Sequence, residues 1–247
     1  MRVLGVIPAR LGSTRLPNKP LQMLAGEPLV TRVIQRVQEH GLTDELVVAT
    51  DSPMVAQVVE RAQARAVLTS RNHLTGTDRV AEVATRPEFA GFDVIVNVQG
   101  DEPFLAREAL AGSIDQVERG ADIGTAAAPL DPGVAGDPAR VKVVTDGNGR
   151  ALYFSRALIP HRRETADDAE GLYWQHLGIY AFTRAALQRW SRLEPSPAEL
   201  AERLEQLRAL HHGLTIGVAR LAEPVEPGVD TLDDLRRAEA HWQALQG

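Results

Sequence analysis

The sequence predicts an α/β fold in which a mostly parallel β-sheet is flanked by helices. In the N-terminal half, short apolar runs alternate with amphipathic stretches, so the hydrophobic period switches between that of a strand and that of a helix. The apolar runs are nearly continuous, which is typical of parallel strands covered on both faces. After about Pro129 a hairpin signal interrupts this pattern, which indicates an inserted segment before the chain returns to the sheet.

The first half contains five expected strands and four expected helices. The strands, dominated by Val, Ile, Leu and Ala, are expected at residues 2–7, 46–49, 66–68, 94–98 and 123–127. The helices are expected between them at residues 28–39, 53–64, 77–84 and 106–119. Two of these helices begin with proline, which suits a first helical turn because its missing N–H would have no partner there.

The second half begins with a predicted hairpin whose strands cover residues 141–145 and 151–154, joined by the turn Asp146-Gly147-Asn148-Gly149. A mixed apolar segment at 174–182, a helix at 197–210, a strand at 214–219 and a last helix at 231–245 follow. We therefore expect a single domain over residues 1–247, with an inserted lobe at roughly 129–195.

Composition excludes several classes of protein. The 27 Lys and Arg residues against 33 Asp and Glu residues give a net charge of -6, so a basic field for nucleic acid or an anionic membrane is not expected. No apolar stretch approaches the ~20 residues needed to cross a bilayer, and the apolar opening ends at Arg10, which disfavours a signal peptide. The chain has no cysteine, so thiolate chemistry is excluded and a cytoplasmic location is expected. These observations favour an enzyme that acts on small molecules.

A basic loop follows the first predicted strand, from Pro8 to Pro20. Ligands collect at the carboxyl ends of parallel strands. The loop carries the cations of Arg10, Arg15 and Lys19 together with two hydroxyl groups, which is typical of a phosphate-binding segment. It matches neither the G-x-x-x-x-G-K-[ST] nucleotide loop nor the G-x-G-x-x-G dinucleotide fingerprint. The alternative is a solvated connecting loop whose cations face water.

Two acidic segments are candidates for a metal site. Asp101 and Glu102 follow the buried-type strand at 94–98, and Asp230 precedes the last predicted helix. Mg²⁺ normally binds one or two carboxylates together with substrate phosphates, so Asp101 and Asp230 are candidate ligands if the sheet brings them together. The alternatives are a β-turn at Asp101 and a helix cap at Asp230.

Three segments in the second half could bind a polar small molecule, and each has a structural alternative. Arg156 could be simply solvated, and His176 could be a hydrogen-bonded histidine of the core. Glu205 with Arg208 could be an ordinary surface pair three residues apart on a helix.

The chain as a whole resembles the CMP-Kdo synthetases, or 3-deoxy-manno-octulosonate cytidylyltransferases, where Kdo is 3-deoxy-D-manno-octulosonate. The resemblance rests on eight ordered segments: IPARLGSTRLPNKPL, TGTDR, VIVNVQGDEP, VKVV, ALYFSRALIP, HLGIYAF, SPAELAERLEQLRAL and GVDTLDDL. It implies a nucleotide-diphospho-sugar transferase fold of the glycosyltransferase-A type, with a mixed sheet and an inserted hairpin lobe that forms a homodimer contact.

The resemblance also implies the reaction and the site. The anomeric hydroxyl of Kdo would attack the α-phosphorus of CTP with the help of Mg²⁺, giving CMP-Kdo and pyrophosphate for lipopolysaccharide-type glycan synthesis. The implied catalytic residues are Lys19, Arg10, Asp101 and Asp230, of which the two aspartates would be the Mg²⁺ ligands. The nucleotide would be bound by Arg10, Ser13, Lys19, Asn72, Thr75 and Gly76. The sugar acid would be bound by Gln99, Arg156, His176, Glu205 and Gln206.

Some positions depart from the usual pattern of that family. Asn72 and Thr75 stand where the family usually has Asp and Ser, His161 stands where an aromatic residue is usual, and Gln175 replaces a basic residue. Acylneuraminate and 8-amino-Kdo cytidylyltransferases are the nearest alternatives, and a nucleotide-sugar sensor without catalysis is an alternative from another class. The HLGIY and LEQLR segments favour Kdo.

Overall fold

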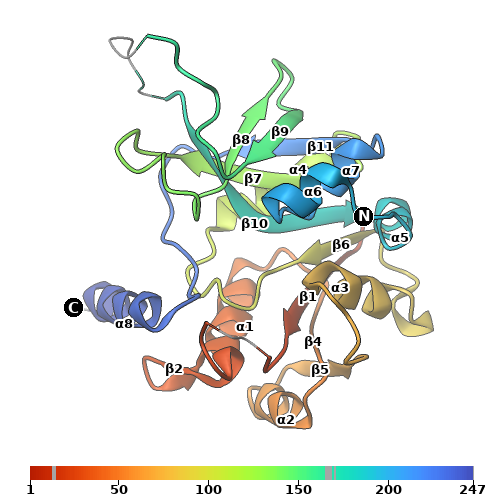
Figure 1. Cartoon of the computed structure of the whole chain (residues 1–247). Coiled ribbons are helices and arrows are strands. Elements are labelled where there is room, and N and C mark those ends of the chain that lie inside the picture. Colours follow the sequence, from red (N-terminus) through yellow and green to blue (C-terminus); the bar gives the residue numbers. More distant parts are fainter. Residues whose placement is uncertain (13–14, 165–168, 170, 247) are drawn as a thin grey trace. The chain divides into compact units, whose positions relative to one another are not determined.

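The computed structural model has the alternating helices and strands of an α/β protein (Figure 1). The structure describes residues 1–12, 15–164, 169 and 171–246. These residues form two compact units, the first made of Met1–Ala106 and Val225–Gly247 and the second of Arg107–Pro224. The α/β prediction is confirmed, whereas the inserted lobe at roughly 129–195 is a finer division and stays a prediction.

The first unit contains a parallel sheet in the strand order β6-β1-β4-β5. Its strands are β1 (Val3–Ala9), β4 (Glu45–Thr50), β5 (Arg65–Leu68) and β6 (Val94–Asn97). All four residues of β6 and nearly all of β1 are buried, as the continuous apolar runs predict. The carboxyl ends of these strands therefore meet at one edge of the sheet, where the predicted phosphate loop begins.

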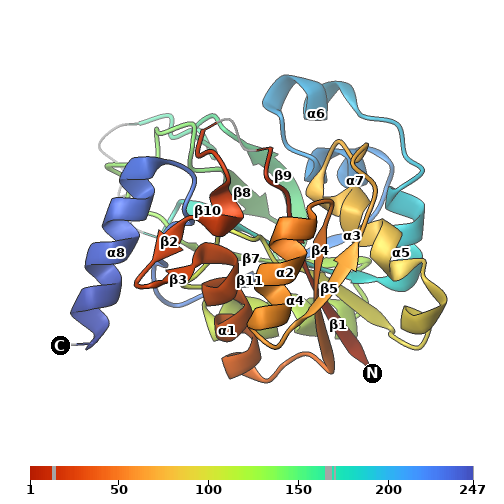
Figure 2. The ribbon, with the colours of Figure 1, turned by 90° about the horizontal axis from the view of Figure 1, so that it is seen from below.

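The helices of the first unit are α1 (Leu29–His40), α2 (Pro53–Arg61), α3 (Gly76–Ala84) and α8 (Leu232–Gln246). Two short 3₁₀ helices, η1 (Lys19–Leu21) and η2 (Pro87–Phe89), and the small hairpin of β2 (Met23–Leu24) and β3 (Glu27–Pro28) complete it. Helix α3 packs along β1, β4 and β6, and α8 lies beside β2 (Figure 2).

Helix α2 ends three residues earlier than predicted. Gln63 has a left-handed backbone conformation, with φ of 57°, and its N–H donates to the carbonyl of Glu60. The N–H of Ala64 then donates to Val59, so the chain closes the helix and turns into β5. Helical periodicity continues through this turn in the sequence, so it could not mark the end.

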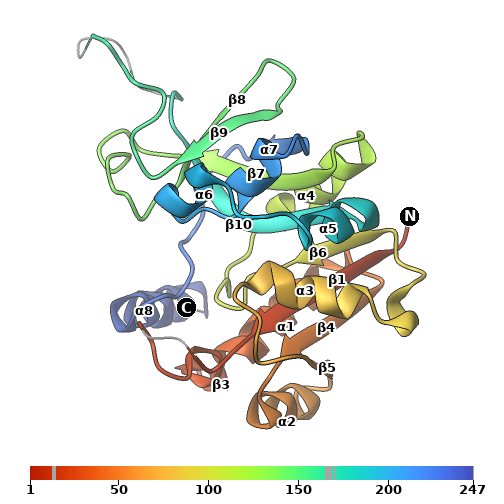
Figure 3. The ribbon, with the colours of Figure 1, turned by 45° about the vertical axis from the view of Figure 1, so that its right-hand side comes forward.

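The second unit contains a mixed sheet. In it, β7 (Ile123–Pro129) pairs with β11 (Ile216–Arg220) in parallel and with β10 (Trp174–Thr183) in antiparallel. The predicted hairpin is present as β8 (Lys142–Thr145) and β9 (Ala151–Ser155), and β8 also pairs with β10. Helix α4 (Arg107–Glu118) packs on β7, β10 and β11, while α5 (Arg184–Trp190) packs on β10 (Figure 3).

The single helix predicted at 197–210 is wrong, because the structure has two helices there. Helix α6 (Pro197–Glu202) ends at Arg203, whose backbone is left-handed with φ of 55°. Helix α7 (Gln206–His211) then begins after Glu205 and packs on β9. Ser196 caps α6 and reciprocates with Glu199 in a capping box, so the start of the helix was readable from the sequence but its interruption was not.

In the part of the chain that the structure describes, no helix is both long enough and apolar enough to cross a membrane.

Candidate active site

The basic loop begins where β1 ends. Arg10 is exposed directly after the last strand residue, and Lys19 opens the 3₁₀ helix η1 after a left-handed residue, Asn18, with φ of 52°. This turn brings the Lys19 side chain back to a half-buried position. Ser13, predicted to bind phosphate, lies outside the described residues.

The ammonium of Lys19 joins the two predicted metal ligands. It donates hydrogen bonds to Asp101 Oδ2 and, at 2.8 Å, to Asp230 Oδ1. The other carboxylate oxygen of Asp230 lies 3.0 Å from a guanidinium nitrogen of Arg15. Asp101 and Asp230 are thus brought together in the first unit, as the sequence analysis required of a shared site.

The charges of this cluster shift the pKa values of its members. Burial by itself would lower the pKa of Lys19, but the carboxylates of Asp101 and Asp230 outweigh burial and raise it above its ordinary value. Burial, followed by the negative charges of Asp101 and Asp230, raises the pKa of Glu102 to about 8. Glu102 is therefore mostly protonated at neutral pH, while Lys19 keeps its positive charge.

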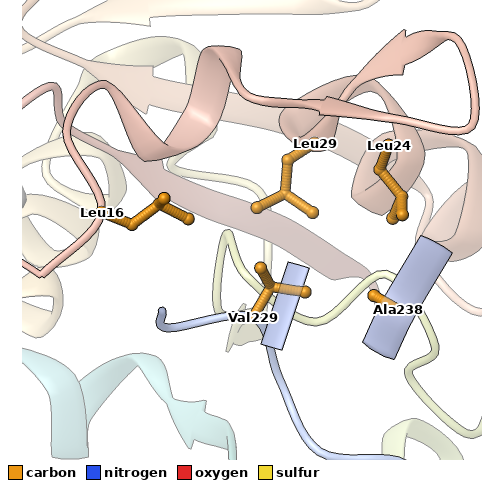
Figure 4. Packing of buried hydrophobic residues seen from close by; sticks show 5 residues of the cluster. All are labelled: Leu16, Leu24, Leu29, Val229 and Ala238. Atoms are coloured by element: carbon orange, nitrogen blue, oxygen red, sulfur yellow. The ribbon is translucent and has the colours of Figure 1, made fainter. Parts of the chain in front are cut away.

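An apolar cluster supports the segments that carry Lys19 and Asp230. Leu16, in the loop before Lys19, and Val229, next to Asp230, pack together with Leu24, Leu29 and Ala238 (Figure 4). Leu24 and Leu29 are fully buried, and burial of such a side chain contributes about 1.5–3 kcal/mol. Packing of these apolar side chains thus holds the segments of Lys19 and Asp230 at a fixed distance from each other.

Gly228 allows the Asp230 segment to lie against the Asp101 segment. The N–H of Val229 donates to the carbonyl of Asp101 at 2.8 Å. A Cβ atom on Gly228 would stand only 2.8 Å from Glu102 Oε1 and 3.2 Å from that same carbonyl oxygen. The two segments could not approach so closely with a larger residue at 228.

Pro8, near the end of β1, is in close contact with two glycines from neighbouring segments. A Cβ on Gly100 would lie 2.9 Å from the carbonyl oxygen of Pro8, and one on Gly76 would lie 3.3 Å from its ring. The segment that includes Asn72 and the segment that carries Asp101 therefore both reach the edge of the sheet where the basic loop starts.

Thr75 and Asn72 differ in how they are held. The Thr75 hydroxyl caps α3 by accepting from the N–H of Asp78 at 3.1 Å, and the Asp78 carboxylate accepts from the N–H of Thr75. Asn72 is exposed, and its N–H donates to the Ser70 hydroxyl. Thr75 is thus fixed by the helix start, while the Asn72 side chain faces solvent.

The donor set at Lys19 fits a magnesium ion that also binds phosphate. Two carboxylates, Asp101 and Asp230, converge on one cationic position, and Mg²⁺ normally takes one or two carboxylates and completes its shell with phosphate oxygens and water. Within the described ranges, no three or more His, Cys, Asp or Glu side chains group together in a way that could hold a metal ion. Magnesium itself therefore remains a prediction.

In the second unit, His176 lies on β10 and is buried. Its Nε2 is 3.0 Å from the hydroxyl of Thr125 on β7, and its ring stacks edge-on against Phe154 at 4.9 Å between centroids. Burial lowers the pKa of His176 to about 3, so the imidazole is neutral at physiological pH. It is a hydrogen-bonded histidine of the core.

Glu205 and Gln206 lie at the start of α7. The negative charge of Glu205, added to burial, raises the pKa of Tyr180, whose ring lies 5.4 Å from that of His176. Gln206 is buried. The side chains of His176 and Glu205 are therefore both neighbours of Tyr180, although they come from different elements.

The sequence alternative pairs Glu205 with Arg208 three residues on, and the structure shows a partner of Arg208 on another helix. Arg208 forms a buried two-pronged ion pair with Glu199 of α6, with Nε 2.9 Å from Oε2 and a terminal nitrogen 2.5 Å from Oε1. This pair joins the two short helices across their interruption.

Arg156 is not the solvated residue that the alternative supposed. Its guanidinium donates to the carbonyl oxygens of Glu202 at 2.8 Å and Pro138 at 3.0 Å, with a longer contact of 3.5 Å to Arg203. These contacts use three of its five N–H groups. With respect to the described residues, two N–H groups, one on each terminal nitrogen, remain for a further acceptor.

The sequence predicts no site role for three residues of the first unit. Arg15 is expected only as a loop cation, Glu102 only as an acid beside Asp101, and Gly228 only as part of the GVDTLDDL segment. The contacts of Glu102 and Gly228 depend on segments more than 120 positions apart, so no local signal could have revealed them. Gln99, predicted to contact sugar, is half-buried two residues after the end of β6.

Comparison with known proteins gives consistent matches. Residues 4–216 match the family model described as Cytidylyltransferase. The 3-deoxy-manno-octulosonate cytidylyltransferase of Gemmatimonas aurantiaca is 56% identical over 248 residues, which cover 99% of this chain and 96% of that protein. The enzyme of the same name from Methylococcus capsulatus is 46% identical over 96% of this chain and 95% of its own length.

Solved structures agree with these matches. A CMP:2-keto-3-deoxy-manno-octonic acid synthetase complexed with CTP is similar with a TM-score of 0.92 and 36% identity, over 99% of this chain and 100% of that one. A 4-diphosphocytidyl-2C-methyl-D-erythritol synthase from Anaerococcus prevotii, at 14% identity and a TM-score of 0.64 over 98% of each chain, supports the fold alone. The chain belongs to the 3-deoxy-manno-octulosonate cytidylyltransferase family.

Proposed function

We propose that this chain activates Kdo with CTP, forming CMP-Kdo and releasing pyrophosphate. The observation that carries the proposal is the convergence of Asp101 and Asp230 on the ammonium of Lys19, beside a basic loop at the carboxyl end of β1. Two acids and a cation at one position suit a triphosphate that arrives with its own metal ion. The CTP-bound structural relative supports CTP as the nucleotide.

The triphosphate is assigned to the basic loop. Arg10 and Lys19 offset the negative charge that builds on the leaving pyrophosphate, and Ser13 donates a hydrogen bond to phosphate. Asn72, Thr75 and Gly76 are assigned to the nucleoside, because this segment packs against the same strand end through Pro8.

Asp101 and Asp230 are the proposed Mg²⁺ ligands. When bound, the ion would neutralise charge on the α-phosphate and lower the pKa of the attacking hydroxyl. The protein's part is to keep the two carboxylates together while Lys19 releases them and turns toward the phosphates. Lys19 already stands between the two carboxylates. The Lys19 ammonium and the arriving Mg²⁺ are both cations, so one positive charge replaces another at that position.

The sugar acid is assigned to Gln99, Arg156, His176, Glu205 and Gln206. The two uncommitted N–H groups of Arg156 suit a carboxylate, which accepts two parallel hydrogen bonds. His176 is neutral and keeps its ring fixed through Thr125. The reaction itself is an in-line displacement: the anomeric hydroxyl gives up its proton to solvent as its oxygen bonds to the α-phosphorus, the bond to the bridging oxygen breaks, and the electron pair leaves with pyrophosphate.

A cytoplasmic location, where CTP is made, a homodimer, and a place in lipopolysaccharide-type glycan synthesis complete the proposal. Static light scattering of the purified chain would test the dimer directly, and a mass equal to one chain would reject it.

One substrate panel tests the function. Pyrophosphate release is measured for ATP, GTP, CTP and UTP, each with Kdo, 8-amino-Kdo and a sialic acid, in the presence of Mg²⁺. We expect release from CTP with Kdo above every other combination. Preference for 8-amino-Kdo or sialic acid would replace the sugar assignment, and binding without release in every combination would favour a sensor.

A further inference from the structure

Lys142 is a fully buried lysine on β8, at 0% exposure. It is also one of only two lysines in the chain, the other being Lys19, although 27 residues are Lys or Arg. A buried ammonium is costly unless each of its N–H groups has an acceptor. The site around Lys142 must therefore supply three acceptors.

Three backbone carbonyls provide them. The Lys142 ammonium donates to the carbonyl oxygens of Asp137 at 3.0 Å, Arg140 at 2.5 Å and Arg156 at 2.8 Å. All three donors of the ammonium are thus used, and none of the acceptors is a carboxylate. A compact group with three rotatable donors fits this arrangement, whereas a planar guanidinium would not.

These contacts and the side chain of Arg156 form one continuous hydrogen-bond network. Lys142 holds the turn from Asp137 to Arg140 on two sides, and the carbonyl of Pro138, inside that turn, accepts from the Arg156 guanidinium at 3.0 Å. Lys142 also holds the backbone of Arg156 itself. Both the base and the far end of the Arg156 side chain therefore depend on the same ammonium.

Glu202 closes the other side of Arg156. Its carboxylate accepts from the Ser155 hydroxyl at 2.6 Å and from the N–H of Arg156 at 2.9 Å, and its carbonyl accepts from the Arg156 Nε. With the turn and Glu202 in place, the guanidinium can direct only its two remaining N–H groups outward.

We propose that Lys142 is a positioning residue, which fixes the 137–140 turn and thereby presents the Arg156 guanidinium to the carboxylate of the sugar acid. This inference rests on the proposed function for the identity of that acid. The hydrogen-bond network around Arg156 does not depend on the proposed function. In this proposal, Lys142 contacts neither substrate and acts only through Arg156.

The first test is a double-mutant cycle in the full-length chain, with pyrophosphate release as the readout. We expect Lys142→Met to raise the KM for Kdo roughly tenfold, equivalent to about one well-formed hydrogen bond, with the KM for CTP unchanged. In an Arg156→Ala background, Lys142→Met should then have no further effect on the KM for Kdo. Independent, multiplying effects of the two substitutions would overturn the positioning role, as would an equal rise in both KM values. Arg119→Met, at an exposed basic residue directly after α4 in the same unit, is the matched control.

The second test needs no sugar, so it separates this inference from the proposed function. The Nε–H resonance of Arg156 should be protected from solvent exchange in the unsubstituted protein and should exchange faster in Lys142→Met. Absence of pyrophosphate release from CTP and Kdo in the unsubstituted protein would reject the function, while an unchanged Arg156 exchange rate would overturn the positioning. Lys142→Gln is the milder second variant. Loss of folding in both variants would make Lys142 a residue of stability alone and also overturn the proposal.

Discussion

Lys19 Nζ lies 2.8 Å from Asp230 Oδ1, although 211 positions separate the two residues in the chain. The same ammonium contacts Asp101, which lies 82 positions away. The Lys19 ammonium therefore offsets the repulsion between the two acidic segments. Its removal should affect both the unliganded protein and the turnover rate.

Lys19→Met removes this shared cation while it keeps the length of the aliphatic chain. We expect turnover to fall by about 10²–10³-fold, the usual loss when one preorganised charge partner of a transition state is removed, and the KM for CTP to rise. Pyrophosphate release at varied CTP measures both. Arg71→Met, an exposed cation of the same unit, is the control; an unchanged rate for Lys19→Met would make the loop cation a bystander.

Asp101→Asn and Asp230→Asn test the proposed metal site. Each should raise the Mg²⁺ concentration needed for half-maximal activity and lower the maximal rate, because an amide is a poorer ligand than a carboxylate. Binding of Mn²⁺ in the presence of CTP, followed by electron paramagnetic resonance, should weaken in parallel. Chelation of divalent ions should stop the unsubstituted enzyme.

The matched control for these variants is Asp233→Asn on α8. Asp233 is exposed and pairs with Arg236 on the same helix, three residues from Asp230 in the sequence. We expect its metal requirement to equal that of the unsubstituted chain. Normal turnover and Mn²⁺ binding in both Asp101→Asn and Asp230→Asn would refute the metal assignment.

Gly228→Ala should push apart the segments of Asp101 and Asp230. The new Cβ would stand 2.8 Å from Glu102 Oε1, so a shift is required, and overpacking of this kind costs about 1–3 kcal/mol. We expect a lower free energy of unfolding in urea and a several-fold weaker response to Mg²⁺. Gly147→Ala, where a Cβ would meet nothing within 4 Å, is the control. Equal behaviour of the two alanine variants would show that the close approach at Gly228 has no consequence.

His176 should make the second unit sensitive to acid. Burial lowers its pKa to about 3 in the folded chain, whereas an unfolded histidine has a pKa of about 6.5. Between these values the unfolded state binds a proton that the folded state does not, so the free energy of unfolding decreases as pH falls below about 6.5.

His176→Gln cannot titrate in this range. We expect the substitution to reduce the dependence of unfolding free energy on pH by up to about 1.4 kcal/mol per pH unit between pH 6 and 4. Urea unfolding at several pH values measures this slope, with the exposed His161→Gln as the control. Parallel slopes for His176→Gln and the unsubstituted chain would contradict the assignment.

Hydrophobic periodicity was sufficient to predict nearly every long element of this fold. The strand predicted at 123–127 is β7, and the turn Asp146 to Gly149 joins β8 to β9 as expected. The two-residue strands β2 and β3 and the helix α5 were not predicted, because such short segments leave no repeating pattern. The interruption at Arg203 depends on a left-handed backbone in a residue that does not favour one.

The acidic and basic residues of the site were named from the sequence, but their partners were not. The sequence places Asp101 at a strand end and Lys19 in a loop, and only the fold shows that one ammonium serves both aspartates. Arg156 illustrates the converse: an arginine that reads as solvated proves to be held by carbonyls from the Pro138 turn and α6. Such contacts depend on backbone atoms, which every residue carries and no motif reveals.

The scarcity of lysine gives the protein a built-in chemical reporter. Lys142 is sealed from solvent, so Lys19, with 18% of its side chain exposed, is the only lysine amine that a water-borne reagent can reach. Its two carboxylate partners hold it protonated and unreactive toward acylating agents, and a bound nucleotide would shield it further. The rate at which an amine-specific label modifies Lys19 therefore reports the state of the proposed catalytic centre without any substrate analogue, dye or engineered tag.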